Sequence, residues 1–476
     1  MPDASTTDVN AEIAAARASW QRSDIAQAAA TLRRVRDVAP AREDAALLLA
    51  EVLRSDARLS AAAAVLLDMC RANAFAPVLC VRAANFARQC DRHAIAAQIC
   101  EAALARGTPS PELLIVAGHI ARESGDFATA RWRYLAALDA GADLRQHQVL
   151  GALANSRRYT DPADADLARF DRAYRDLALG ARARASAGFA LAKALGDVGD
   201  IAAAVPVLRG SNALVRSAVA WRADAWHSFV TARMRERVGR AAAMDPAAFV
   251  PVFIVGVPRS GTTLTASLLA KTSAARDRGE LRALRFIAER LVAGGYLQDR
   301  AALAEAAGLY RKLAVQDDAP ATWYLDQDPL NFRWLHLAAA LFPQAKVAHL
   351  RRDPRDTALS LWSQDFAHPD MAFAYDFDTI AAFMAGHATL MARWKATLPV
   401  PVFELDYETL VGAPERTLAT LRDFIGVPGR AAGTTSADAA PVQSASVWQA
   451  RQPVYTTSVG RWRKYLPYVP ELERFA

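Results

Sequence analysis

Lysine is scarce in this sequence of 476 residues: only six of its 57 basic residues are lysines, and arginine supplies the rest of the basic charge. The basic residues form no block interleaved with aromatic residues, so the sequence predicts no nucleic-acid partner. The arginine excess has two interpretations. It reflects a GC-rich genome, or it serves the bidentate binding of phosphate or sulfate groups.

Long apolar runs are also lacking. No run of about eighteen apolar residues occurs, so the sequence predicts no membrane span. The first residues, MPDASTTDVNAE, lack the basic region and the apolar core of a secretory signal. Hydrophobic residues make up 53% of the chain and charged residues 22%, which fits a globular protein. We therefore predict a cytoplasmic protein.

Cysteine occurs only as Cys70, Cys80, Cys90 and Cys100. This spacing matches no C-x-x-C metal pattern, and a cytoplasmic compartment is reducing, so neither a disulfide framework nor a metal site is predicted. We expect small thiols buried between packed helices.

The length predicts two domains. Residues 10–240 are rich in alanine and have apolar residues at helical spacing, with a short polar turn that carries an aspartate at intervals of 32, 35, 35 and 74 residues. These aspartates are Asp24, Asp56, Asp91, Asp126 and Asp200. A period near 34 is typical of tetratricopeptide (TPR) helix pairs, which stack into a solenoid. Residues 10–240 are therefore predicted as an all-α, TPR-like repeat domain, with an irregular helical bundle as the alternative.

Two features refine this prediction. Small residues at Ala28, Ala62, Ala96 and Ala130 would let the two helices of each pair approach closely. Residues 157–177 break the rhythm and are predicted as a loop or an atypical repeat. Because such repeats stack into extended surfaces, we expect this half to bind or position a partner.

The second half, residues 250–476, alternates strand and helix signals. Short apolar runs at 251–257, 345–350 and 401–405 are each followed by a loop and a helical pattern. This order predicts an α/β domain with a central parallel sheet, and ligands of such sheets bind at the carboxyl ends of the strands.

The segment 251-PVFIVGVPRSGTTLTASLLA-270 predicts a phosphate-binding turn between a strand and a helix. Backbone N–H groups at such a junction favour an anion. The turn ends Gly261-Thr262-Thr263, where an ATP- or GTP-hydrolysing loop would have Gly-Lys-Ser/Thr. Arg259 would supply the cationic side chain in place of the missing lysine.

A second cluster, 346-KVAHLRRDPRDTALSLW-362, follows another predicted strand. It places Arg352 at the strand end and Ser360 two helical turns later, where both could reach a second phosphate. The alternative is a surface ion-pair cluster, which contributes little.

Together, PRSGTT and RRDPRDTALS resemble the nucleotide-binding motifs of sulfotransferases, which use 3′-phosphoadenosine 5′-phosphosulfate (PAPS). With its repeat half, the chain resembles a bacterial tetratricopeptide-repeat sulfotransferase, whose catalytic half is similar to protein-tyrosine sulfotransferases. The resemblance implies a P-loop-like fold, PAPS as co-substrate, adenosine 3′,5′-bisphosphate (PAP) as product and no metal. It assigns Arg352 and Ser360 to the 3′-phosphate. It assigns the 5′-phosphosulfate to Pro258, Arg259, Ser260, Gly261, Thr262 and Thr263.

Three further segments carry residues that the resemblance assigns. In 276-RDRGELRAL-284, Glu280 is implied as the general base that activates the acceptor, although sequence alone would favour a surface glutamate. In 404-ELDYETLVGAPE-415, Tyr407 is implied to border the adenosine, with Glu408 bracing the next helix. The C-terminal loop 444-SASVWQARQPVYTTSVGRWRKYL-466 is implied to close over the nucleotide, and the residues assigned there are Arg451, Tyr455, Ser458 and Arg461.

One position departs from the family pattern. In 325-LDQDPL-330 the family has Asp-Lys-x-Pro, and its lysine is expected to stabilise the leaving phosphate, whereas this chain has Gln327. A glutamine donates a hydrogen bond but carries no charge, which weakens stabilisation of the developing anion. Either an arginine such as Arg333 or one from the C-terminal loop substitutes, or turnover is reduced.

The sequence thus predicts an enzyme that transfers a sulfonate group from PAPS to an acceptor hydroxyl, with tyrosine of a protein or peptide held by the repeats as one candidate. Glu280, Arg259 and Gln327 are the predicted catalytic residues. Two alternatives remain: a non-catalytic TPR scaffold with a degenerate nucleotide-binding fold, and a small-molecule kinase.

Overall fold

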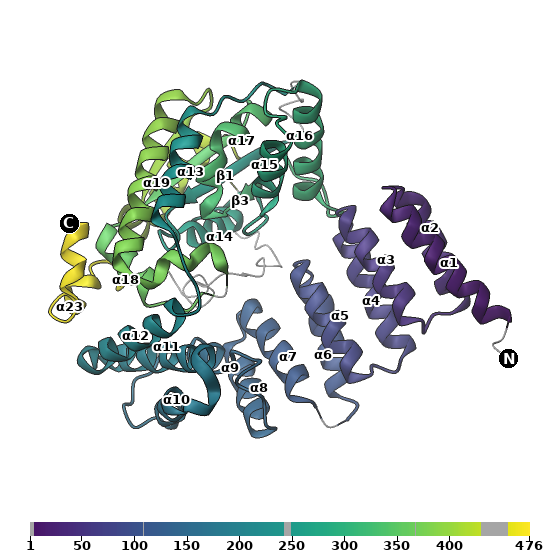
Figure 1. Ribbon diagram of the computed structural model, residues 1–476, viewed down its shortest axis with the longest axis horizontal. Coiled ribbons are helices and arrows are strands. Elements are labelled where there is room, and N and C mark those ends of the chain that lie inside the picture. The colour runs from purple at the N-terminus through teal and green to yellow at the C-terminus, as the bar shows by residue number, and fades with distance from the viewer. Residues whose placement is uncertain (1–3, 108, 242–248, 367, 430–455) are drawn as a thin grey trace. The chain divides into compact units, whose positions relative to one another are not determined.

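A computed structural model of the chain describes residues 4–107, 109–241, 249–366, 368–429 and 456–476. The chain forms two compact units: Met1–Ala142 with Val315–Pro320, and Asp143–Ala314 with Ala321–Ala476. Figure 1 labels many of their helices and the strands β1 and β3. None of the helices in the described ranges combines the length and apolarity needed to span a bilayer.

The first unit consists of helix pairs, as the aspartate period predicts. Its helices are α1 (Ala4–Gln21), α2 (Ile25–Val38), α3 (Glu43–Ser55), α4 (Leu59–Ala72), α5 (Pro77–Gln89), α6 (His93–Leu104), α7 (Pro111–Ser124) and α8 (Phe127–Asp139). Each pair packs internally and against its neighbours along the chain. Ala28, Ala62, Ala96 and Ala130 are fully buried in the pairs, which confirms their predicted place at the close approach of two helices. All four cysteines are free and buried, as expected.

The recurring aspartates lie in the turn inside each pair. Asp24 and Asp126 are the N-caps of α2 and α8, and each accepts a hydrogen bond at 3.0 Å from a backbone amide of the first turn. Asp56 and Asp91 lie one or two residues before the cap position. A short polar residue at the cap position satisfies an amide that the helix itself leaves unpaired, which explains the aspartates at positions 24 and 126.

Helix α4 is capped from a distant part of the chain. The Asp317 carboxylate accepts hydrogen bonds from the amides of Ser60 and Ala61, both at 2.9 Å. Arg92 joins the same group, because its guanidinium donates to the Ser60 hydroxyl at 2.8 Å and forms an ion pair with Asp318 at 3.0 Å. Burial alone would raise the pKa of Asp317, but the hydrogen bonds from Ser60 and Ala61 outweigh burial and lower it.

Replacing Asp317 with alanine should therefore cost about 1 kcal/mol of local stability, the usual worth of an N-cap. The measurement is hydrogen exchange, which should be faster at the amides of Ser60 and Ala61. Because the pKa of Asp317 is lowered, its contribution is present above the unfolded pKa and is lost as the pH falls through the folded pKa. The matched control is Asp68→Ala, which removes an exposed carboxylate paired with Arg71 on the same helix. Equal exchange in both variants would contradict the capping role.

The second unit begins with further helices: α9 (Val149–Ala154), α10 (Ala165–Arg175), η1 (Leu177–Leu179), α11 (Gly180–Val198), α12 (Ile201–Arg216) and α13 (Ala223–Arg235). Asp200 again caps the second helix of a pair, α12, by accepting from Ala203 N at 3.0 Å. The predicted end of the repeat domain near residue 240 stays a prediction, since the compact units describe packing and not the extent of a repeat.

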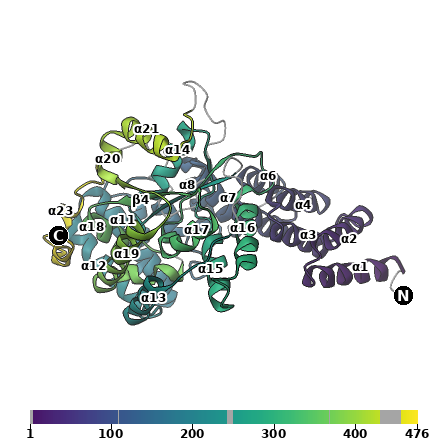
Figure 2. The same cartoon turned by 90° about the horizontal axis from the view of Figure 1, so that it is seen from above.

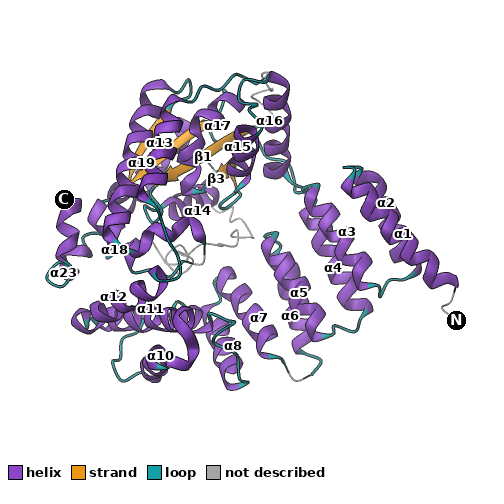
Figure 3. Cartoon of the chain, in the orientation of Figure 1, coloured by secondary structure: helices purple, strands orange, loops and turns teal. Residues whose placement is uncertain are grey.

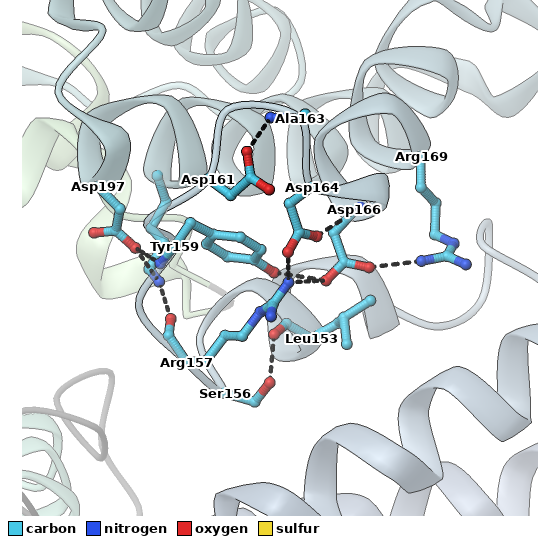
Figure 4. Close-up of polar contacts among 11 residues, drawn as sticks. Leu153, Ser156, Arg157, Tyr159, Asp161, Ala163, Asp164, Asp166, Arg169 and Asp197 are labelled. Carbon is cyan, nitrogen blue, oxygen red and sulfur yellow. Dashed lines mark hydrogen bonds and ion pairs between the residues drawn. The ribbon is translucent and has the colours of Figure 1, made fainter.

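The irregular segment 157–177 contains a loop and the short helix α10. Figure 4 shows how polar contacts hold the loop. The buried Tyr159 donates its hydroxyl to Asp166 at 3.0 Å and its amide to Asp197 at 3.1 Å, and Arg157 pairs with Asp164. The break in rhythm is thus a loop with paired charges between α9 and α10.

Helix α13 packs on the α/β part of the second unit. The Trp226 ring stacks on Phe383 with centroids 5.0 Å apart, and its indole N–H donates to the Ala382 carbonyl at 3.1 Å. Gly386 makes room for the indole, because a Cβ there would lie 2.4 Å from Trp226 Nε1. This helix of the predicted repeat region therefore contributes to the core of the α/β part.

A five-stranded parallel sheet in the order β2-β3-β1-β4-β5 forms the centre of this part (Figure 3). The strands are β1 (Val250–Gly256), β2 (Arg276–Asp277), β3 (Trp323–Asp326), β4 (Lys346–Arg351) and β5 (Val402–Asp406). The predicted all-α and α/β architecture is thus confirmed. The sequence predicted β1, β4 and β5 within one residue but gave no signal for β2 and β3, which are short.

Helices cover both faces of the sheet, as a fully buried parallel sheet requires. On one face, Val252 and Ile254 of β1 pack with residues of α14 (Thr262–Thr272), α20 (Tyr407–Gly412) and α21 (Pro414–Ile425), and Figure 2 shows these helices together. On the other face, Phe253 packs against Tyr310 of α16 (Arg300–Val315).

The remaining elements are short helices and one long one. They are α15 (Ala283–Ala293), η2 (Pro329–Trp334), α17 (Leu335–Leu341), α18 (Pro354–Trp362), η3 (Pro369–Tyr375), α19 (Phe377–Thr397), α23 (Trp462–Tyr465) and η4 (Pro470–Phe475).

Candidate active site

The turn after β1 has the backbone conformation of an anion-binding loop. Arg259 and Gly261 have positive φ, +76° and +109°, and α14 begins directly afterwards. A Cβ on Gly256 would lie 2.6 Å from the Leu350 carbonyl oxygen, and one on Gly261 would lie 2.6 Å from the Tyr407 ring. Both glycines are therefore required by close approach. A left-handed arginine is strained, and such strain is found where function fixes a side chain.

Several predicted residues line this turn as buried groups. Pro258, Ser260, Thr262 and Thr263 are all buried, and the Ser260 hydroxyl has no hydrogen-bond partner among the described residues. Thr265 binds the helix start instead, since its hydroxyl donates to the Gly261 carbonyl at 3.0 Å. A buried hydroxyl without a partner suits a turn that receives a polar ligand.

The structure brings Arg259, Ser360 and Arg352 together. Arg259 Nε donates to Ser360 Oγ at 3.1 Å, and Arg352 Nη1 donates to the Arg259 carbonyl at 3.0 Å. The Arg352 guanidinium also lies 4.7 Å from the centre of the Tyr407 ring. The ends of β1, β4 and β5 thus deliver two arginines, a serine and a tyrosine to one place.

The described part of the C-terminal segment joins this group through Ser458. Its carbonyl accepts from Arg352 Nη2 at 2.9 Å, and its hydroxyl hydrogen-bonds with the Tyr407 hydroxyl at 2.7 Å. Arg461 points elsewhere: its guanidinium donates to the Tyr465 hydroxyl at 2.9 Å. Arg451 and Tyr455 lie outside the described residues.

The charges of the second motif separate into different roles. Arg351 is exposed and pairs with Asp406 at 2.8 Å, whereas its neighbour Arg352 belongs to the group above. Asp353 caps α18 and accepts from the amide of Arg355 at 2.8 Å, while its own amide donates to Glu408 at 3.0 Å. The alternative of a surface ion-pair cluster therefore describes Arg351, and Arg355 with its partner Asp353, but not Arg352.

Asp356 was not predicted as a site residue, yet it is 2% exposed and accepts hydrogen bonds from the amides of Gly460 and Trp462. It thereby links α18 to the C-terminal segment. No sequence signal identified it, because its partners are backbone amides more than a hundred residues away.

Glu280 lies beside β3 in a loop that the sheet edge holds. The Gln327 amide donates to the Gly279 carbonyl at 2.9 Å, so the predicted base and Gln327 lie on adjacent segments. Surrounding protein, and then the negative charge of Asp328, raise the pKa of Glu280 to about 7 against the attraction of Arg282 and Arg259. The residue as a whole is nevertheless exposed.

Gln327 is buried between two aspartates. Its exposed fraction is 4%, and its Oε1 has no hydrogen-bond partner in the described part of the chain. Burial, and then repulsion from Asp328, raise the pKa of Asp326, and burial also raises the pKa of Asp328. Asp326 accepts hydrogen bonds from the Tyr310 hydroxyl at 2.8 Å and from the Leu281 amide at 3.3 Å, which fixes the Glu280 loop.

Arg333 was considered as a substitute for the missing lysine. Its guanidinium lies over the rings of Trp226 and Phe383, at 5.4 and 5.8 Å from their centres. Burial lowers the pKa of Arg333 against the attraction of Asp370 and Asp328. Arg333 thus contacts two aromatic rings, and its part in charge stabilisation stays a prediction.

Comparison with known proteins shows what this region is similar to. Residues 251–431 match the sulfotransferase family. An uncharacterised protein of Aquifex aeolicus is 33% identical in an alignment 310 residues long that covers 60% of this chain and 40% of that protein. Protein-tyrosine sulfotransferase 1 of Danio rerio is 26% identical in an alignment 200 residues long that covers 37% of this chain and 53% of that enzyme. The chain therefore spans about half or less of the length of these relatives.

Solved structures are also similar. The sulfotransferase domain of a Synechococcus olefin synthase is 21% identical, with a TM-score of 0.36, over 50% of this chain and 98% of that domain. In sequence, residues 251–431 are similar to the sulfotransferase family, and the remainder of the chain lies outside that match.

Proposed function

We propose that the chain is a PAPS-dependent sulfotransferase that transfers a sulfonate group to an acceptor hydroxyl, with tyrosine of a protein or peptide as the candidate acceptor. The observation that carries the proposal is the meeting of Arg259, Ser360 and Arg352 beside the turn after β1. A donor with a phosphosulfate at one end of its ribose and a phosphate at the other needs two adjacent anion sites. Arginines suit both.

The turn after β1 would hold the 5′-phosphosulfate. Its candidate residues are Pro258, Arg259, Ser260, Gly261, Thr262 and Thr263. The unpartnered Ser260 hydroxyl and the amides at the start of α14 suit an anion there. The glycines leave no side chain between the backbone and such a ligand.

Arg352 and Ser360 would hold the 3′-phosphate. Arg352 uses two of its five N–H groups on the carbonyls of Arg259 and Ser458, which leaves three for an anion. Tyr407 packs under the guanidinium and fixes its plane. Arg451 and Arg461 remain candidates for the same nucleotide.

Glu280 would act as the general base. In the proposed reaction the acceptor oxygen forms a bond to sulfur, the bond between sulfur and the bridging oxygen of PAPS breaks, and its electron pair leaves with PAP. The acceptor proton passes to Glu280. A pKa of about 7 gives a carboxylate that is basic and still substantially ionised at neutral pH.

The uncharged Gln327 favours a second candidate function, a nucleotide-binding scaffold without turnover.

We predict that Gln327→Lys raises turnover about tenfold, because a cation beside the leaving phosphate stabilises the charge that develops there. The same cation should favour the Glu280 carboxylate, so the acid limb of the pH–rate profile should move to lower pH. Gln327→Met, which is of similar size and uncharged, is the control. A rate and pH profile unchanged in the lysine variant would place Gln327 away from the reacting groups.

Turnover itself tests the proposal. The purified chain would be incubated with sulfur-labelled PAPS and a panel of peptides with and without tyrosine, small phenols and sugars. Label transfer to a hydroxyl acceptor is expected. PAPS binding with no transfer to any acceptor in the panel would favour the scaffold, and ATP-dependent phosphorylation would favour the kinase.

A further inference from the structure

The buried carboxylate of Asp356 binds the backbone of the C-terminal segment. Its Oδ2 accepts from the amide of Gly460 at 2.6 Å and its Oδ1 from the amide of Trp462 at 2.9 Å. A carboxylate removed from water must be compensated by donors, and bonds to a charged group are stronger than neutral ones. Both oxygens of Asp356 are therefore committed to the backbone of the C-terminal segment.

The bound segment turns sharply between the two amides. Gly460 has φ of +71°, a conformation that favours glycine. Two residues earlier, Ser458 contacts Arg352 through its carbonyl and Tyr407 through its hydroxyl. Fixing the backbone at Gly460 thus fixes Ser458 against the guanidinium that is proposed to bind the 3′-phosphate.

A second contact supports the same attachment. The Arg355 guanidinium lies 3.9 Å from the centre of the Trp462 ring, and Asp353 holds Arg355 at 3.1 Å. The first turn of α18 therefore contacts the C-terminal segment in two ways. Asp356 accepts two backbone hydrogen bonds, and Arg355 makes a cation–π contact with Trp462. Residues 352–356 thus carry both Arg352 and the two side chains that bind the C-terminal segment.

We infer that Asp356 is a positioning residue for donor selection: it holds residues 458–462 so that Ser458 keeps the Arg352 guanidinium oriented toward the 3′-phosphate. The inference rests on the proposed function. It assigns no contact between Asp356 and the nucleotide. Its consequence is that loss of Asp356 weakens recognition of the 3′-phosphate selectively.

The test is calorimetric titration of the full chain with PAP and with adenosine 5′-monophosphate, which lacks the 3′-phosphate. In Asp356→Asn one acceptor becomes a donor that faces an amide, so PAP affinity should fall by about tenfold or more, the worth of one hydrogen bond to a charged group. Affinity for the monophosphate should stay within about twofold. In turnover, KM for PAPS should rise while kcat is retained.

Two further variants make the test decisive. Gly460→Ala strains the turn without touching α18 and should show the same selective loss. Asp376→Ala removes the N-cap of α19, away from this segment, and should lower stability without changing either affinity. If Asp356→Asn does not fold, Gly460→Ala decides.

The outcomes separate the two proposals. Absence of PAP binding by the unaltered chain would overturn the proposed function. PAP binding by the unaltered chain with equal affinity in Asp356→Asn, or an equal loss for both nucleotides, would overturn the positioning role alone.

Discussion

Replacing Glu280 with glutamine is expected to lower turnover by about 10²- to 10⁴-fold, the usual contribution of a general base. Affinity for PAP should change little, because the carboxyl is assigned to the acceptor. The measurement is sulfonate transfer from labelled PAPS under saturating donor. The matched control is Glu289→Gln, which removes an exposed carboxylate from the nearby helix α15, where it pairs with Arg285. Equal activity of the Glu280 variant and the unaltered chain would remove Glu280 from the mechanism.

The pH dependence follows from the same carboxyl. Because surrounding protein and Asp328 raise the pKa of Glu280 to about 7, the base form accumulates only above that pH. We expect kcat/KM for the acceptor to rise with pH and level off above about pH 7. The profile of Glu280→Gln should lose this limb.

Stability should respond in the opposite direction. A carboxyl whose folded pKa is raised opposes folding once it is ionised, so its penalty grows as the pH rises from the unfolded pKa through about 7. Glu280→Gln should therefore unfold at a higher temperature than the unaltered chain at pH 8, and the difference should shrink at pH 5. Part of the expected gain comes from removing the repulsion between Glu280 and Asp328, which raises the pKa of Glu280.

Replacing Arg352 with alanine is expected to lower PAP affinity by about 10- to 150-fold, the worth of hydrogen bonds to a charged group. Binding of adenosine 5′-phosphosulfate, which lacks the 3′-phosphate, should change little. The neighbouring residue provides the control: Arg351→Ala removes the same charge, but Arg351 is exposed and pairs with Asp406. The difference in PAP affinity between the two variants thus separates the direct contact of Arg352 with the 3′-phosphate from the general attraction of positive charge.

A contrary result is equally clear for this pair. If both arginine variants lose PAP affinity equally, the effect is a general loss of positive charge. If neither does, the second motif is not the 3′-phosphate site.

The repeat half was predictable because its signals are local. An aspartate in each inner turn caps or precedes a helix, and a small residue such as Ala62 lies where two helices meet. Both effects act between residues close in sequence, so they leave a period. The capping of α4 by Asp317 could not be predicted, since the carboxylate comes from more than two hundred residues away.

The sheet was predicted in part for a similar reason. Strand β1 is buried along its whole length and reads as a continuous apolar run, whereas β2 has two residues and β3 four. Such short strands are defined by pairing with a neighbour, and periodicity does not identify them.

Some residues of the candidate site could be predicted from the sequence and others could not. Arg259, Arg352 and Ser360 follow recognisable strand ends, and the structure brings them together. Asp356 and Asp326 bind backbone amides and a distant hydroxyl, so their roles depend on tertiary contacts that spacing does not encode. The placement of Arg461 at the nucleotide site stays a prediction, since its guanidinium contacts the Tyr465 hydroxyl in the structure.

Calorimetric titration of the purified, folded chain with PAP, beside ATP with Mg²⁺, tests the central claim most directly. The account predicts saturable binding of PAP that is tighter than binding of ATP and that is lost in Arg352→Ala. No binding of PAP, or a preference for ATP, would contradict the assignment of the turn after β1 and of Arg352 to a sulfonate donor.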